Sequence, residues 1–175
     1  MRSAKGTVDL VAFQLRLNES LDSIPAAGAG AAFIGFHCAG RNWLARLDDL
    51  REIESLPTPE KLFKLPLAKD WVSGLASFKG AIQTVVDFQR FLGGAPTQEG
   101  LSARALLIHP RHGIQAALVV GEVAGLLSSE SLVASAPEEA CPWIHAWHRS
   151  PDGKVWALID MGKLAASEDM MNIGR

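Results

Sequence analysis

Short runs of apolar and β-branched residues, broken by glycine, proline and charged residues, dominate the chain from Phe33 onward. Such runs between turn formers are typical of β-strands, because branched and aromatic side chains pack well on a pleated surface. The remaining pattern puts helices mainly near the two ends of the chain. We therefore predict an all-β body with strands over 33–38, 41–45, 50–56, 72–78, 81–88, 104–109, 114–120, 125–132, 143–148 and 155–160.

The stretch 71–94 carries a clear local signal for a β-hairpin. Its two apolar runs are separated by Lys79-Gly80, and a glycine at this point permits a tight reversal of the backbone. Asp87 follows the second run and opens a short helical turn over 88–92, which two glycines end. We expect the Asp87 carboxylate to fix this turn by accepting backbone N–H groups.

The two ends of the chain carry helical patterns. Apolar residues over 8–24 fall on one face at helical spacing, although part of this stretch also alternates as a strand would. The small residues of 25–32 predict a flexible linker, and helical turns are expected over 137–141 and 161–166. The predicted organisation is a helical extension with its linker (1–30), a folded body (31–166) and a C-terminal tail (167–175).

Composition narrows the function classes. The 175 residues hold 17 Lys and Arg against 19 Asp and Glu, with a formal net charge of −2. This balance gives no electrostatic signal for nucleic acid or an anionic membrane. Two cysteines, Cys38 and Cys141, are too few for a disulfide framework and fit a reducing cytoplasm. No apolar run suits a membrane helix, and the first residues lack the apolar segment of a signal peptide.

Candidate catalytic and metal-binding residues occur in pairs that do not form complete sets. His109 and His112 are separated by two residues, as are His145 and His148, and each pair offers two imidazoles to a metal. Neither pair has a Cys or an acid at ligand spacing, and no nucleophile or phosphate-binding motif appears. We therefore predict no enzyme, no metal and no cofactor. The alternative is a metal- or thiol-dependent enzyme that uses His145, His148 or Cys141.

Several motifs stand at matching spacing along the body: Phe33-Ile34-Gly35-Phe36, Gly40-Arg41, Trp71-x-x-Gly74, Lys79-Gly80, Val85-Val86-Asp87-Phe88 and Phe91-Leu92-Gly93. Together they resemble the CheW-like domain family of chemosensory adaptors, whose core reads W/F-x-x-G, N-x-R-G and P-x-x-D-L. Ser77, Lys79 and Thr84 stand where the family usually has Asn, Arg and Pro. The change to Lys79 matters because lysine offers a mobile point charge and not a planar fork.

The resemblance implies a fold and a function. The implied fold is two SH3-like, five-stranded β-barrels that pack on a shared apolar core. The implied function is an adaptor that couples methyl-accepting receptors to the regulatory domain of a CheA-type histidine kinase, in the cytoplasm at membrane-associated arrays. Within the family, Lys69-x-Trp71 and Pro142-Trp143-Ile144-His145 resemble adaptors of type IV pilus (twitching motility) systems. A flagellar-type chemotaxis adaptor is the alternative.

The tip of the predicted hairpin is the candidate protein-binding surface. Lys79 at the tip and Glu52 on the strand over 50–56 present opposite charges among apolar residues, which suits an interface; a charged turn is also the default for any hairpin. In the family, the corresponding positions lie near the groove that receives the helical tip of the receptor. The resemblance therefore predicts an interface made of Leu50, Glu52, Ile53, Phe78, Lys79, Gly80 and Ile82.

Overall fold

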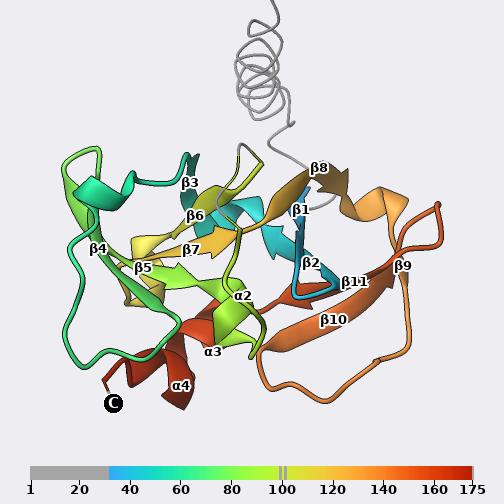
Figure 1. The fold of residues 1–175 in the computed structure, drawn as a ribbon. Coiled ribbons are helices and arrows are strands. Elements are labelled where there is room, and N and C mark those ends of the chain that lie inside the picture. The colour runs from blue at the N-terminus through green and yellow to red at the C-terminus, as the bar shows by residue number, and fades with distance from the viewer. Residues whose placement is uncertain (1–31, 99, 101, 175) are drawn as a thin grey trace, which may run out of the picture. The chain divides into compact units, whose positions relative to one another are not determined.

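A computed structural model describes residues 32–98, 100 and 102–174. The expected N-terminal helix over 8–24 and most of its linker lie outside the described residues. The described body consists of two β-sheets and several short helices (Figure 1), which confirms the all-β prediction. The first sheet has the strand order β8-β1-β2-β11-β10-β9. Its strands are β1 Ala32–Cys38, β2 Arg41–Arg46, β8 Glu122–Ser128, β9 Val133–Ala134, β10 Ile144–Arg149 and β11 Val155–Ile159.

The second sheet has the strand order β3-β6-β7-β5-β4. Its strands are β3 Leu50–Glu54, β4 Val72–Phe78, β5 Ala81–Asp87, β6 Arg104–Ile108 and β7 Ala116–Val120. The α-helices described are α2 Phe88–Phe91, α3 Met161–Ala166 and α4 Glu168–Met171, and the 3₁₀ turns are η1 Leu47–Asp49, η2 Pro59–Lys61, η3 Pro110–His112 and η4 Ser129–Ser131.

The second sheet is contiguous in sequence, whereas the first is assembled from both sides of it. The chain leaves the first sheet through η1 and returns to it between β7 and β8. A parallel ladder between β2 and β11, in which Trp43 pairs with Ala157, joins the early hairpin to the late one. A second parallel ladder, between β5 and β7, joins the β4–β5 hairpin to the other strands of the second sheet. Each sheet therefore depends on pairings between strands that are distant in sequence.

The structure corrects several details of the sequence predictions. The first sheet has six strands and not five, and both sheets are open in their ladder order and not closed barrels. The strand expected over 125–132 is β8, which begins earlier at Glu122 and ends at Ser128 before η4. The helical turn expected over 137–141 is not a helix. The helix expected over 161–166 is confirmed as α3, and the tail adds α4.

Both faces of many strands are buried, and successive residues enter different cores. Along β7, Leu118 and Val120 enter a core shared by the two sheets, whereas Ala117 and Val119 enter a smaller core of the second sheet. This follows from the two-residue period of side chains on a strand. The second-sheet core consists of Ala76, Phe78, Val85, Ala105, Leu107, Ala117 and Val119. The corresponding first-sheet core consists of Phe33, Leu44, Leu132, Trp156 and Leu158.

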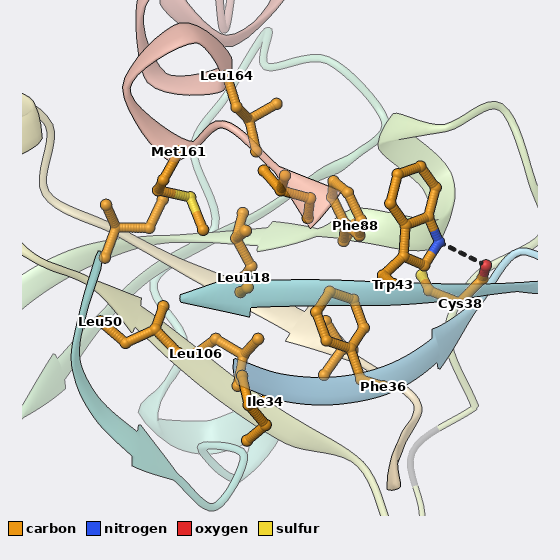
Figure 2. Close-up of a cluster of buried hydrophobic side chains, with 14 of the residues drawn as sticks. Ile34, Phe36, Cys38, Trp43, Leu50, Phe88, Leu106, Leu118, Met161 and Leu164 are labelled. Carbon is orange, nitrogen blue, oxygen red and sulfur yellow. Dashed lines mark hydrogen bonds between the residues drawn. The ribbon is translucent and has the colours of Figure 1, made fainter. Parts of the chain in front are cut away.

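The shared core holds the two sheets together. It combines side chains of both sheets with residues of α2, α3 and α4, and Figure 2 shows part of it. Trp43 lies at one end, with its ring edge-on to Phe88 and its Nε1 donating a hydrogen bond of 3.0 Å to the Cys38 carbonyl oxygen. Fully burying one such large side chain contributes about 1.5–3 kcal/mol. The largest fully buried side chains of the shared core include Trp43, Phe36, Phe88, Ile34, Leu106, Leu118, Ile159, Met161 and Leu164.

Candidate partner-binding surface

The β4–β5 hairpin presents its two turn residues on the surface. Lys79 and Gly80 both have positive φ, at 48° and 85°, and this left-handed pair gives the turn the twist that a two-residue hairpin requires. Phe78 and Ala81 close the ladder on either side of the turn. Positive φ is uncommon for a residue other than glycine. We therefore infer that the flanking ladder holds the backbone of Lys79 in this conformation. The turn thus directs a lysine away from the sheet.

The Lys79 ammonium pairs with two carboxylates of β3. Its Nζ lies 2.7 Å from Glu52 Oε1 and 3.0 Å from Glu54 Oε1. The hydrogen bonds that Lys79 donates to Glu52 and then to Glu54 raise the pKa of Lys79, so its positive charge is favoured. Since β3 and β4 are opposite edges of the second sheet, the pair brings a sheet edge and a hairpin tip together. We call Glu52, Glu54, Lys79, Gly80 and Ile82 the charged tip.

One carboxylate oxygen at the charged tip lacks a partner. Glu52 Oε2 is buried and accepts no hydrogen bond from the described residues. Lysine is a point charge and reaches one oxygen of Glu52, whereas the fork of an arginine would reach both. Glu52 therefore keeps one buried acceptor that the described side chains do not satisfy.

Some of the predicted interface residues are exposed, and others are buried beneath the surface. Leu50 and Phe78 are each only 7% exposed; Leu50 lies in the shared core and Phe78 in the second-sheet core. Ile53 is half-buried against the shared core. Ile82 is 58% exposed and lies opposite Ser77 in the hairpin. Leu50, Ile53 and Phe78 therefore pack in the interior beneath the charged tip. Their contact with a partner stays a prediction.

Glu54 is the member of the charged tip that the sequence prediction did not include. It follows Glu52 by two positions on the same strand, and residues two apart on a strand point to the same face. The pairings confirm this, since Glu52 lies opposite Leu107 and Glu54 opposite Ala105, both of which face the second-sheet core. The two-residue spacing could therefore have identified Glu54 once Glu52 was chosen.

Two of the buried or half-buried acids act as helix caps. Asp87 accepts hydrogen bonds from Arg90 N at 3.3 Å, Thr97 N at 2.9 Å and Thr97 Oγ1 at 2.6 Å. Asp160 caps α3 by accepting from Lys163 N at 3.0 Å. The prediction that Asp87 fixes a local turn is confirmed.

The histidines do not converge on a shared centre. His109 Nδ1 accepts a hydrogen bond from Arg111 N, whereas His112 Nε2 lies 2.9 Å from the buried Asp49 carboxylate. His145 is exposed on β10, and His148 is half-buried next to the Phe33 ring. Within residues 32–98, 100 and 102–174, no group of three or more His, Cys, Asp or Glu side chains could hold a metal ion.

The two cysteines lie in different surroundings. Cys38 is buried in the shared core, where burial, with a smaller effect of the Asp87 carboxylate, raises its pKa to about 12. Its thiol is therefore protonated at neutral pH, and a protonated thiol is a poor nucleophile. Cys141 is half-buried in the connection between β9 and β10. Neither cysteine is part of a disulfide.

The described body is therefore two packed β-sheets with an exposed, ion-paired hairpin tip. Residues 32–169 match the family model of the CheW-like domain, and the chain belongs to this family, whose members are scaffold adaptors and not enzymes. The enzyme alternative that used His145, His148 or Cys141 is therefore wrong. No helix in the described part of the chain has the length and apolar character needed to cross a membrane.

Two known proteins show how far the likeness extends. The chain is 28% identical over 149 residues to the protein PilI of Pseudomonas aeruginosa, across 80% of this chain and 78% of that protein. The crystal structure of the scaffolding protein TtCheW from Thermoanaerobacter tengcongensis matches with a TM-score of 0.65 and 16% identity, over 80% of this chain and 95% of that chain. The second likeness shows the fold.

Proposed function

We propose that this chain is a cytoplasmic adaptor that couples methyl-accepting receptors to a CheA-type histidine kinase in type IV pilus twitching motility. The observation that carries the proposal is the likeness to PilI, which extends over 78% of that protein's length. The charged tip supports the receptor part, because the family resemblance puts the positions of Glu52 and Lys79 near the receptor groove.

The charged tip has the chemistry that a helical receptor tip requires. The Lys79 side chain is 63% exposed, and an ammonium has three N–H donors. Glu52 and Glu54 accept two of them, so a third donor is free to meet a carboxylate or carbonyl of a partner. Ile82 adds exposed apolar surface beside this charge. Apolar area combined with a few directed polar groups is the usual composition of a transient interface.

The mechanism is positional. The adaptor binds the receptor at the charged tip and the regulatory domain of the kinase, itself a homologous β-domain, at the ends of its sheets. A receptor movement changes kinase activity only if the adaptor binds one kinase state more tightly than another. The large shared core makes the two sheets one rigid connector, because close-packed interiors transmit displacement. The side chains of the adaptor take part in no covalent step.

A titration with separate charge reversals tests the proposal. The purified chain is titrated with the kinase regulatory domain and, separately, with a soluble receptor tip, both from the same organism. Lys79→Glu and Glu52→Lys are expected to weaken only receptor binding. Lys154→Glu is the matched control, since Lys154 also follows a hairpin turn and pairs with an acid, Asp152, at 3.6 Å. Absence of binding to either partner at high micromolar concentration would refute the coupling proposal.

The pilus and flagellar outputs are distinguished in cells. A deletion strain is expected to lose the spreading zone of twitching motility beneath agar and to keep swimming motility in soft agar. Complementation with the unaltered chain restores twitching, whereas Lys79→Glu does not. Loss of swimming with normal twitching would assign the chain to flagellar chemotaxis and would leave the receptor-binding result intact.

A further inference from the structure

Exposed apolar side chains lie along the connection between β3 and β4 and on the C-terminal segment that pairs with it. Figure 1 shows this connection, in teal, running along the outer side of β4 and reaching the C-terminal end of the chain. Within residues 32–98, 100 and 102–174, three of the five exposed large apolar side chains belong to these two segments. They are Phe63 at 67%, Leu67 at 81% and Met171 at 65% exposure.

The backbone of the connection is fixed at two points. Phe63 and Leu75 of β4 exchange two N–H to carbonyl hydrogen bonds of 2.8 and 2.7 Å. Further along, Ala68 forms an isolated bridge with Gly174, which follows α4. The apolar side chains therefore stand on a surface that is formed before any partner arrives, which lowers the entropic cost of binding.

Leu67 combines the highest exposure of the three with an unfavourable backbone. Its φ is 56°, a left-handed conformation that is uncommon for residues other than glycine and unusual for a bulky side chain. A leucine that is 81% exposed gains little from packing within its own chain. Backbone strain of this kind is concentrated at functional surfaces. An apolar contact outside the chain would explain why a leucine occupies this position.

The same surface carries opposite charges at its two ends. Lys61 and Lys64 are exposed on either side of Phe63, and Glu168 and Asp169 are exposed in the first turn of α4. None of these four charged side chains forms an ion pair with the described residues. Unpaired charges of opposite sign at the ends of an apolar surface make that surface complementary to itself.

Neighbouring charges leave this polarity in place. Glu60 offsets one of the two lysines, and its carboxyl is engaged locally, because hydrogen bonds from its own backbone and from Thr58 lower its pKa. Lys163, in the last turn of α3, offsets one of the two acids of α4. Each end therefore keeps a net charge, positive beside Phe63 and negative at α4.

We propose that this surface binds a second copy of the chain in a two-fold symmetric pair. A two-fold interface brings the same patch of both copies together, so the patch must complement itself. The lysines of one copy then face the α4 acids of the other, Phe63 packs against Met171 of the second copy, and the two Leu67 side chains meet near the axis. None of these residues belongs to the charged tip, so this inference is independent of the proposed function.

Sedimentation velocity of the full chain tests the pairing. The surface is small, so we expect a weak pair with a dissociation constant of about 10–100 μM. The sedimentation coefficient should therefore rise towards that of a dimer between about 10 μM and about 1 mM chain. Raising the salt concentration from about 50 mM to about 500 mM should weaken the pair about threefold, because exposed charges are screened. A chain that stays monomeric at about 1 mM would overturn the proposal.

A matched pair of substitutions separates contact across the interface from stability of the fold. Leu67→Asn removes the apolar contact but suits the left-handed backbone, so it is expected to weaken the pair about tenfold without lowering the thermal midpoint. Val133→Asn is the control, since Val133 is 62% exposed on β9, outside this surface, and it should pair as the parent does. Equal pairing of the parent and Leu67→Asn would refute the proposed surface.

Two charge-reversed chains test the symmetry of the pair. One carries Lys61→Glu and Lys64→Glu and is acidic at both ends of the surface; the other carries Glu168→Lys and Asp169→Lys and is basic at both ends. Each alone should be monomeric where the parent pairs, because like charges meet across the interface, whereas an equimolar mixture should form a mixed pair. A mixture that remains monomeric, or reversed chains that each pair as the parent does, would contradict the two-fold arrangement.

Discussion

Lys79 Nζ lies 2.7 Å from Glu52 Oε1 and thereby joins the tip of the β4–β5 hairpin to β3, the opposite edge of the same sheet. The ladder order within the described residues contains no β3–β4 pairing, so the sheet is open by hydrogen bonding and bridged by an ion pair. This explains how a five-strand sheet encloses the second-sheet core without a closed ladder. The Lys79 side chain that bridges the edges is also 63% exposed.

Gly74→Ala should destabilise the fold much more than Gly40→Ala does. Gly74 has φ 144° at a bulge of β4, and an added Cβ would clash with the Phe63 carbonyl oxygen. Backbone strain and the clash together should lower the free energy of unfolding by about 2–4 kcal/mol. Gly40→Ala is the control, because its φ is also positive, at 70°, but nothing lies within 4 Å of the added Cβ.

The Gly40→Ala control should cost only about 1 kcal/mol. Urea denaturation followed by tryptophan fluorescence measures both values. Equal costs for the two variants would mean that the backbone at Phe63 does not press on β4, and would contradict a steric role for the glycine of the Trp71-x-x-Gly74 motif.

Asp87→Ala should destabilise the fold more than Asp160→Ala does. Both acids cap a helix, but Asp87 is 8% exposed and accepts three hydrogen bonds, whereas Asp160 accepts one from a helix N–H. Loss of Asp87 also leaves the part-buried Thr97 donors without partners, so we expect a loss of about 2–3 kcal/mol, against about 1 kcal/mol for Asp160. Thermal and urea denaturation of both variants, side by side, check the ranking; a reversed order would refute it.

The stability of the fold should fall at alkaline pH because of Cys38. Burial and the Asp87 carboxylate raise its pKa from 9.0 to about 12. A pKa raised on folding stabilises the protein fully below the unfolded value and is lost as the pH rises towards the folded value, so the window is pH 9 to 12. At pH 10 the loss is roughly 1 kcal/mol.

Comparison with Cys38→Ala isolates this contribution. The variant loses packing in the shared core at every pH, but it carries no thiol that ionises in the unfolded chain. The difference in free energy of unfolding between the parent and Cys38→Ala should therefore shrink between about pH 8 and pH 10. A difference that stays constant over this range would show that Cys38 ionises equally in both states.

The local parts of the fold were predictable from local chemistry. The hairpin over 72–88 follows from two β-branched runs around Lys79-Gly80, and the caps at Asp87 and Asp160 follow from an acid at the end of a strand. The charges at Glu52 and Lys79 could be chosen because the family resemblance marked them. Their contact needed the structure, since they lie on opposite sides of the sheet order.

The errors have physical reasons. Leu50 and Phe78 are buried in the structure, and their contact with a partner stays a prediction. The segment 137–141 was expected to be helical, yet it is a bent connection whose Glu139 pairs with Arg41 of β2. The parallel ladder of β2 with β11 has no local signal in the sequence.

A charge exchange at the tip tests the central claim, which is that Lys79 and Glu52 form a receptor-binding surface and not only an ion pair that stabilises the fold. Lys79→Glu and Glu52→Lys are made singly and together, and the affinity for a receptor tip is measured by calorimetry with the thermal midpoint of each variant. The double variant should recover the thermal midpoint of the parent but bind the receptor about tenfold more weakly or worse. A double variant that recovers both stability and receptor affinity would contradict the claim.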